Sequence, residues 1–304
     1  MALSPLRALA SSPIDIVVPY APGGTADALA RLISQYLGPK LHASVVVLNK
    51  AGASGVIGER FVAEARADGL TLLYDATPFA INPSLEKLPF DPQKDLVPVT
   101  MVARTPMLLC VPKSSPFHSL QDLIAAAKAR PGKLTFGSGG QGTVQYMGAE
   151  LFCQGAGIKM LHVPYRSGGP ALTAIAAGEI DLGFGNLPAV SAQVKGGLMK
   201  ALAITSPQRN PAFPDVPTIA EAAVPHYQSF EWNGMFAPKG TSREAVEQLQ
   251  VAVKDVLEMP DVKSRFDSLG STIVASTPDE FRKFLAEDIV RWSTTVKNAG
   301  IHKE

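Results

Sequence analysis

The feature that most constrains the fold is the stretch from Lys133 to Phe152, KLTFGSGGQGTVQYMGAELF. It contains a short apolar strand at 134–136, a loop with four glycines, and a segment with the apolar spacing of a helix. Glycines let a backbone approach a ligand closely, and the first turn of a helix has unpaired N–H groups at the positive end of its dipole. Thr143 can cap this helix. The stretch therefore predicts an anion site built without Lys or Arg.

The same order of strand, glycine turn and helix occurs at the start of the chain. A strand at 14–20 leads into Gly23-Gly24 and a helix that we expect to end at Gly38-Pro39. Further strands are expected at 45–48, 70–74, 99–103, 107–111, 158–163, 180–184, 200–205, 231–237 and 272–274. Residues 79–98 are rich in proline and polar groups and are predicted to form a connecting loop. The alternation of strands and helices predicts an α/β fold with mostly parallel sheets flanked by helices.

A second α/β unit follows the first and divides the chain into two lobes. At 304 residues the chain is long enough for two domains. Three helices expected from about 241, 260 and 277 have no sheet of their own, so we predict that they pack on the first unit. The first lobe is then discontinuous, 13–104 plus 226–304, and the second is 105–225. Two crossing segments can act as a hinge, and residues 1–12 are interpreted as a leader or signal remnant.

Composition argues against several classes of function. The chain has 28 basic and 27 acidic residues, a net charge of +1, which argues against broad nucleic-acid or membrane-surface binding. The two cysteines, Cys110 and Cys153, lack C-x-x-C spacing and are expected to be free, buried thiols. The five histidines show no metal-ligand spacing, so we expect no metal and no cofactor. No G-x-S-x-G, H-E-x-x-H or P-loop motif is present, and we expect no enzymatic activity.

The glycine loop also admits a rival interpretation as a nucleotide site. Gly137-x-Gly139-x-x-Gly142, after a strand and before a helix, matches the dinucleotide fingerprint. That fingerprint usually includes an acidic residue about 20 residues further on, where this chain has HVPY at 162–165. Arg166 can meet a ribose phosphate instead. A nucleotide-binding enzyme that uses this loop therefore stays open as an alternative.

A series of motifs follows in order along residues 13–301: PYAPGGTAD, LNKAGASGVIG, ADGLTLLYD, GSGGQGTVQYMGAELF, VPYRSGGPAL, PDVPTIAE, WNGMFAPKGT and TPDEFRKF. Together they resemble the Bug family, the extracytoplasmic solute receptors of tripartite tricarboxylate transporters. The resemblance implies a periplasmic, type II two-lobed (Venus flytrap) binding protein that closes on a small organic acid and delivers it to membrane transporter subunits. It also implies a signal peptide that is removed or truncated in this chain, and we expect a monomer. A ligand sensor that feeds a signalling partner has the same binding chemistry and stays open as well.

The resemblance further implies which residues hold the ligand, mainly through loop amides, hydroxyls and bridging waters. Carried over position by position, they are Tyr20, Gly23, Gly24, Thr25 and Thr77 in the first lobe and Ser138, Gly139, Gly142, Thr143, Tyr165 and Asn186 in the second. To these we add Asp75, which can contact a ligand amine, and Gly140, Tyr146 and Arg166, which lie in or beside the second-lobe turns. The family often has Ser-x-x-His where this chain has Thr-Val-Gln-Tyr at 143–146, and Tyr-Lys/Arg-Gly where this chain has Tyr-Arg-Ser at 165–167. No relative's ligand is therefore transferred, and dicarboxylates, amino acids and aromatic acids are the expected ligand classes.

Overall fold

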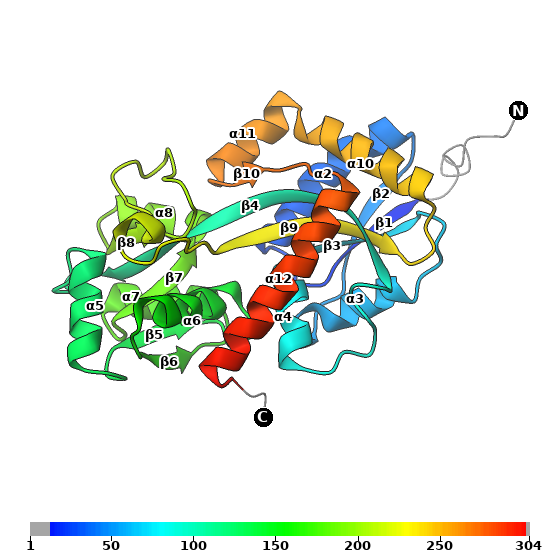
Figure 1. Ribbon diagram of the computed structural model, residues 1–304. Coiled ribbons are helices and arrows are strands. Elements are labelled where there is room, and N and C mark those ends of the chain that lie inside the picture. Colours follow the sequence, from blue (N-terminus) through cyan, green and yellow to red (C-terminus); the bar gives the residue numbers. More distant parts are fainter. Residues whose placement is uncertain (1–12, 302–304) are drawn as a thin grey trace, which may run out of the picture. The chain divides into compact units, whose positions relative to one another are not determined.

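The computed structural model describes residues 13–301, in which strands and helices alternate for most of the chain (Figure 1). The predicted leader, residues 1–12, lies outside the described residues. Contacts divide the chain into two compact units. Unit 1 contains the chain up to Arg104 together with 232–267 and 272–293, and unit 2 contains 105–231, 268–271 and the chain from Thr294.

Unit 1 is built on a mixed sheet whose parallel part comes from the start of the chain. Its strands are β1 (Ile14–Val18), β2 (Val45–Asn49), β3 (Thr71–Ala76), the first part of β4 (Leu96–Pro112), most of β9 (Phe230–Pro238), and β10 (Thr272–Ile273). The strand order is β2-β1-β3-β9-β4, with β10 on β4. β1 pairs in parallel with β2 and β3, and Val17 lies beside Leu48 and Leu73. The carboxyl ends of these strands share one edge of the sheet, which is where open α/β sheets bind ligands.

The helices of unit 1 join the strands and cover the sheet. They are α2 (Thr25–Leu41), the short 3-10 helix η1 (Ala53–Gly55), α3 (Val56–Ala63), α4 (Pro78–Leu85), α10 (Arg243–Leu257), α11 (Pro260–Ser268) and α12 (Pro278–Ala299), the last two of which end beyond the unit. α2 and α10 pack side by side (Figure 1). The buried face of α10 includes Val246, Leu249 and Val253, at the spacing of an amphipathic helix.

The prediction of a loop at 79–98 is wrong for its first part, because Pro78–Leu85 forms helix α4. Pro78 lies in the first helical turn, where a missing N–H group removes no intrahelical bond. Phe79 is buried and stacks on Phe236 of β9, with the ring centroids 4.5 Å apart. Packing against the sheet therefore stabilises this segment as a helix, although its proline content had favoured a loop.

Two predicted element ends also differ from the structure. The strands predicted at 99–103 and 107–111 form one strand, β4, and Thr105 between them is buried. Helix α2 continues past Pro39 instead of ending there, since a proline in the last turn removes a single N–H group. In both cases the element is longer than the local sequence signals had predicted.

Unit 2 has a second mixed sheet, with strand order β4-β7-β5-β6 and β8 on β4. Its elements are the second part of β4, α5 (Leu120–Ala129), β5 (Thr135–Ser138), α6 (Val144–Ala156), β6 (Leu161–Pro164), α7 (Gly168–Ala177), β7 (Leu182–Asn186), α8 (Leu187–Lys195), β8 (Met199–Ile204) and α9 (Ile219–Ala222). β5 pairs in parallel with β6 and β7, so the carboxyl ends of these three strands share an edge. Cys110 and Cys153 are free and buried, as predicted.

Two of the unit boundaries fall within long strands. They lie between Arg104 and Thr105 in β4 and between Glu231 and Trp232 in β9. The end of the chain was predicted to belong to the first lobe, but from Thr294 it groups with unit 2. There the Gln154 amide donates to the Thr295 carbonyl at 2.9 Å.

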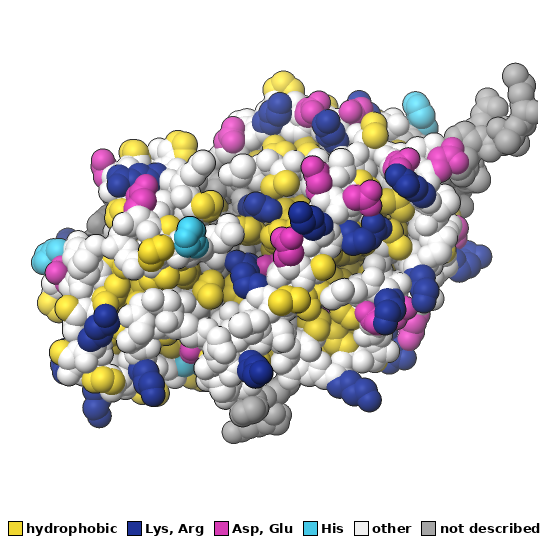
Figure 2. Space-filling model, in the orientation of Figure 1, with side chains coloured by type: hydrophobic (Ala, Val, Ile, Leu, Met, Phe, Trp, Pro, Cys, Tyr) yellow, Lys and Arg dark blue, Asp and Glu magenta, His cyan; other side chains and the backbone are white. Residues whose placement is uncertain are grey.

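The surface shows no segregation of charge on the face drawn in Figure 2. Acidic and basic side chains are interspersed there, and neither sign gathers into one large patch. Among the described helices, none combines the length and the apolar character that crossing a membrane requires.

A buried carboxylate anchors α12 within unit 1. Asp288 is 2% exposed, and its Oδ2 accepts the indole N–H groups of Trp232 and Trp292 at 2.9 and 3.0 Å. The ring of Trp232 meets that of Phe281 edge to face, with the centroids 5.5 Å apart. Gly234 on β9 makes room for this contact, because a Cβ atom there would lie 2.2 Å from the Phe281 ring.

We expect Asp288→Ala to lower the free energy of unfolding by about 3 kcal/mol, because two buried indole N–H groups lose their acceptor. Urea denaturation followed by tryptophan fluorescence measures the change. Asp279→Ala is the matched control, since Asp279 lies on the same helix in an exposed ion pair with Arg282. Its expected effect is below about 0.5 kcal/mol, and equal losses in the two variants would contradict the anchoring role.

Candidate functional site

The turn between β1 and α2 leads into a helix whose first backbone N–H groups are not capped by a side chain. Gly23 has φ +88°, a conformation that favours glycine, and Gly24 is the N-cap of α2 without a side-chain hydrogen bond. The first N–H groups of this 17-residue helix are therefore left for another acceptor, at the positive end of the helix dipole. A Cβ atom built on Gly24 meets nothing closer than 3.9 Å, so the turn is open at that point.

Asp27 fixes this turn from the interior. Its carboxylate accepts the Gly23 N–H at 2.9 Å, pairs with Arg31 at 3.0 Å and accepts the Asn49 amide at 2.9 Å. Asn49 also donates to the Tyr20 carbonyl at 3.1 Å. Burial opposes ionisation of Asp27, but the hydrogen bonds from Arg31, the Gly23 N–H and Asn49 outweigh it and lower its pKa to about 2. The motif LNKAGASG contained Asn49, yet nothing in it indicated this role.

Behind Tyr20 lies a buried pair of carboxyl groups, Glu59 on α3 and Asp75 on β3, both 0% exposed. The Tyr20 O–H donates to Asp75 Oδ1 at 2.6 Å, and the Ala76 N–H donates to the same oxygen at 2.7 Å. Burial raises the pKa of Asp75 to about 7 in spite of these bonds, and burial together with Asp75 raises the pKa of Glu59 well above its ordinary value. Asp75, predicted to contact a ligand amine, therefore lies inside the unit and acts through Tyr20. Glu59 carried no signal in the sequence.

In unit 2 the glycine loop between β5 and α6 is held by two hydroxyl groups. Ser138 Oγ accepts the Gly140 N–H at 3.1 Å and lies 2.8 Å from His162 Nε2. The Thr143 hydroxyl donates to the Gly140 carbonyl at 2.7 Å and accepts the Tyr146 N–H at 3.3 Å, so the predicted helix cap is confirmed. Burial lowers the pKa of His162, which favours the neutral ring. His162 looked like one of several scattered histidines in the sequence and is part of the loop's support.

The turn between β6 and α7 packs directly against this loop. A Cβ atom on Gly139 would lie 3.1 Å from the Gly168 nitrogen, so the two turns touch because Gly139 has no side chain. The Tyr165 N–H donates to the Ser138 carbonyl at 2.9 Å. Helix α7 begins at Gly168 with Ser167 as its N-cap and without a side-chain cap. A second set of first-turn N–H groups is thus left for another acceptor.

Two predicted ligand residues of unit 2 differ in accessibility. Tyr146 is 5% exposed, and its ring packs against those of His162 and Phe136, with the centroids 4.5 and 5.9 Å apart. Burial raises the pKa of its hydroxyl. Arg166 lies in the β6–α7 turn and is exposed. Tyr146 therefore supports the loop from the interior, whereas Arg166 is accessible to a solute.

Asn186, at the end of β7, is held by two neighbours. Its Oδ1 accepts the Gln145 amide at 3.0 Å, and its Nδ2 donates to Glu231 at 2.5 Å. Burial raises the pKa of Glu231, while the bond from Asn186 works in the opposite direction. Thr77 in unit 1 is also used internally: it is buried, and its hydroxyl accepts the Trp232 N–H at 2.9 Å.

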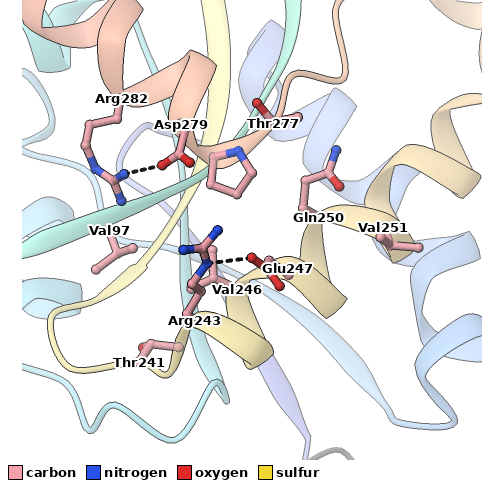
Figure 3. Close-up of a pocket in the computed structure, with 11 residues that line it drawn as sticks. Val97, Thr241, Arg243, Val246, Glu247, Gln250, Val251, Thr277, Asp279 and Arg282 are labelled. Carbon is pink, nitrogen blue, oxygen red and sulfur yellow. Dashed lines mark hydrogen bonds and ion pairs between the residues drawn. The ribbon is translucent and has the colours of Figure 1, made fainter.

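A separate cavity of about 640 Å³ opens on unit 1 beside the starts of α10 and α12 (Figure 3). Its charged lining residues pair along their own helices, Arg243 with Glu247 and Arg282 with Asp279. Their charges cancel, and none of the predicted ligand residues lines this cavity. Nothing in its lining selects a charged solute.

Two solved structures share the fold of this chain over nearly their whole length. R. palustris Rpa4515 with adipate is 34% identical with a TM-score of 0.85, covering 97% of this chain and 99% of that chain. MatC from Rhodopseudomonas palustris with bound malate is 31% identical with a TM-score of 0.80, covering 94% of this chain and 99% of that chain. The protein thus has the α/β fold of two-lobed periplasmic solute-binding proteins.

Comparison of sequences gives the family. A family model described as the tripartite tricarboxylate transporter family receptor matches residues 29–301. Protein BugT of Bordetella pertussis is 38% identical over 291 residues, covering 95% of this chain and 89% of that protein. The chain therefore belongs to the tripartite tricarboxylate transporter receptor family, and the predicted resemblance to Bug receptors is confirmed.

The buried carboxyl pair predicts a pH dependence of stability with a definite sign. Asp75 has a pKa of about 7 in the folded protein, above its ordinary value of about 4 in the unfolded chain, so its contribution to stability is present below about pH 4 and is lost as the pH rises through about 7. We therefore expect the free energy of unfolding of the wild type, measured relative to Asp75→Asn, to fall between about pH 5 and about pH 8. Urea denaturation of both proteins measures this difference. A difference that stays constant with pH would contradict the raised pKa.

Proposed function

We propose that this protein is a receptor that captures a small organic carboxylate through backbone N–H groups at its glycine turns. The observation that carries the proposal is a contrast among helix starts. Among the helices that follow parallel strands, those after β1, β2, β3, β6 and β7 have no side-chain cap at their N-termini, whereas α6 after β5 is capped by Thr143. In contrast, α5, α9 and α10 are capped by Ser119, Thr218 and Ser242. Uncapped first turns offer N–H groups and partial positive charge to an anion.

In this proposal the turns of each unit offer contacts to a solute. The contacting residues are Tyr20, Gly23, Gly24, Thr25, Gly139, Gly140, Gly142, Thr143, Tyr165, Arg166 and Asn186. Four further predicted residues, Asp75, Thr77, Ser138 and Tyr146, are buried and position these contacts from the interior. Most of the donors are amides and hydroxyls, and Arg166 is the cationic side chain among these contacts.

The ligand class and the setting follow from the relatives. Rpa4515 was solved with adipate and MatC with malate, and both molecules are small dicarboxylates. We extend this class to the present chain and propose that it works in the periplasm as a monomer. It delivers its solute to the membrane subunits of a tripartite transporter, without a cofactor and without catalysis of its own.

The glycine loop of unit 2 fits a small solute better than a nucleotide. A dinucleotide site places an acidic residue at the end of the next strand for the ribose. At the end of β6 this chain has Pro164 followed by Tyr165, and His162 within the strand lies 2.8 Å from the Ser138 hydroxyl. Thr143 already occupies one N–H group of α6. The acidic residue that would recognise a ribose is therefore missing at the end of β6.

We expect Gly24→Val to weaken binding of the captured carboxylate by about tenfold or more, because the branched side chain covers the first turn of α2. The fold should tolerate the change, since Gly24 has φ −76° and a Cβ atom there meets nothing closer than 3.9 Å. Gly140 is less suitable, because its φ of +110° strains any side chain. Calorimetric titration with a panel of dicarboxylates, amino acids and aromatic acids, malate and adipate included, measures the affinity.

Ala67→Val is the matched control for this substitution. Ala67 is exposed and lies between α3 and β3, before the amino end of the strand and away from the edge that carries the glycine turns. We expect its affinity to stay within about twofold of the wild type. Absence of binding across the whole panel would refute the proposed function, and unchanged affinity in Gly24→Val would remove the α2 turn from the site.

A further inference from the structure

Two oxygens of the buried carboxyl pair in unit 1 have no hydrogen-bond partner among the described residues. They are Glu59 Oε2 and Asp75 Oδ2. The other Asp75 oxygen is well used, because it accepts the Tyr20 O–H at 2.6 Å and the Ala76 N–H at 2.7 Å. The other Glu59 oxygen accepts only a long bond of 3.5 Å from Asn82. Buried carboxylate oxygens without partners are strongly unfavourable, so the pair requires a proton or a cation.

The surroundings supply no cation. In the described part of the chain, no basic side chain pairs with either carboxyl group, and no set of three metal-ligating side chains is found. The groups that face the pair are Tyr20 from the β1–α2 turn, Asn82 from α4, and Glu86 just after α4, whose charge adds repulsion. The Glu59 and Asp75 carboxyl groups lie close enough to interact directly. One proton between them allows a hydrogen bond within the pair and removes one of the two charges.

The contacts indicate which carboxyl group holds this proton. Asp75 accepts two short bonds at one oxygen, as an ionised carboxylate does, whereas Glu59 has only the long contact with Asn82. Gly55 leaves room for the Glu59 carboxyl group, because a Cβ atom on Gly55 would lie 2.9 Å from Glu59 Oε1. Glu59 is therefore the donor and Asp75 the acceptor of the shared proton.

We propose that Glu59 is a positioning residue that keeps its proton at neutral pH and, through Asp75, commits the Tyr20 hydroxyl hydrogen to the interior. Tyr20 then offers the solute an oxygen lone pair and not a hydrogen. An acceptor at this position repels a carboxylate oxygen and attracts a hydroxyl or ammonium group. The solute is therefore a carboxylate with a hydroxyl or amino substituent, in preference to an unsubstituted diacid. This inference rests on the proposed function, because the solute must be held at the turn that Tyr20 borders.

The shared proton is tested in ligand-free protein. At about pH 8, where ordinary carboxyl groups are ionised, we expect the infrared spectrum to contain the carbonyl stretch of a protonated carboxylic acid. Glu59→Gln should reduce this band and keep the fold, since its amide N–H replaces the donor to Asp75; circular dichroism checks the fold. Glu64→Gln, an exposed change close to the end of α3, is the control and should leave the band unchanged. Absence of the band, or equal intensity in wild type and Glu59→Gln, would overturn the shared proton.

The ligand preference is tested with two pairs of acids that differ by one hydroxyl group, malate with succinate and 2-hydroxyadipate with adipate. We expect one of the two pairs to have the chain length that the site binds. In that pair, calorimetric titration of the wild type should give about tenfold tighter binding of the hydroxy acid. Tyr20→Phe should reduce this preference to below about threefold, because the acceptor oxygen is gone. Glu59→Met, which has a similar size and no donor, should reduce it as well, whereas Glu59→Gln should retain it.

The outcomes separate this inference from the proposed function. Binding of acids without a preference for the hydroxy form, or a preference that survives in Tyr20→Phe, would overturn the positioning role while the receptor function stands. Failure of every acid in the wider panel would refute the proposed function and the ligand preference together. The infrared measurement tests whether Glu59 and Asp75 share a proton, and it does so whatever the binding experiments show.

Discussion

Unsatisfied N–H groups at the starts of helices are the constraint on which the candidate site depends. Such groups are normally capped by side chains or hydrated, and this chain caps α5, α6, α9 and α10 in the usual way. It leaves α2 and α7 uncapped where they follow glycine turns at the carboxyl ends of parallel strands. A carboxylate is complementary to these positions in charge and in hydrogen bonding, so the fold itself supplies most of the binding chemistry.

The two units support their turns by the same device. In each, a buried polar side chain accepts one loop N–H group and thereby fixes the backbone: Asp27 accepts the Gly23 N–H at 2.9 Å, and Ser138 accepts the Gly140 N–H at 3.1 Å. A partner then orients that side chain, Asn49 in unit 1 and His162 in unit 2. Fixing a loop before the solute arrives reduces the ordering that binding must impose, which raises affinity without additional contacts.

The alternation of apolar runs and glycine turns was enough to predict the α/β class and the position of both turns, because those signals are local. Helix α4 was missed because its stability comes from packing of Phe79 on Phe236, far apart in the sequence. The interior partners of the site could not be predicted for the same reason. Glu59 meets Asp75 only because α3 packs against the sheet that contains β3. Tyr146 was expected at the ligand, and nothing local shows that its ring packs against His162.

Capture of an anion by partial charges imposes a condition on the acidic residues nearby. A helix start contributes about half a unit of positive charge, so a single ionised carboxylate close behind it cancels the attraction. The charge of each acid near the turns is reduced or compensated: Asp27 pairs with Arg31, burial raises the pKa values of Glu59 and Glu231, and Asp75 accepts hydrogen bonds from Tyr20 and the Ala76 N–H. These acids can therefore shape and hydrogen-bond the turns without repelling the solute. Amide capture and neutralised interior acids are for this reason two requirements of the same site, and neither works without the other.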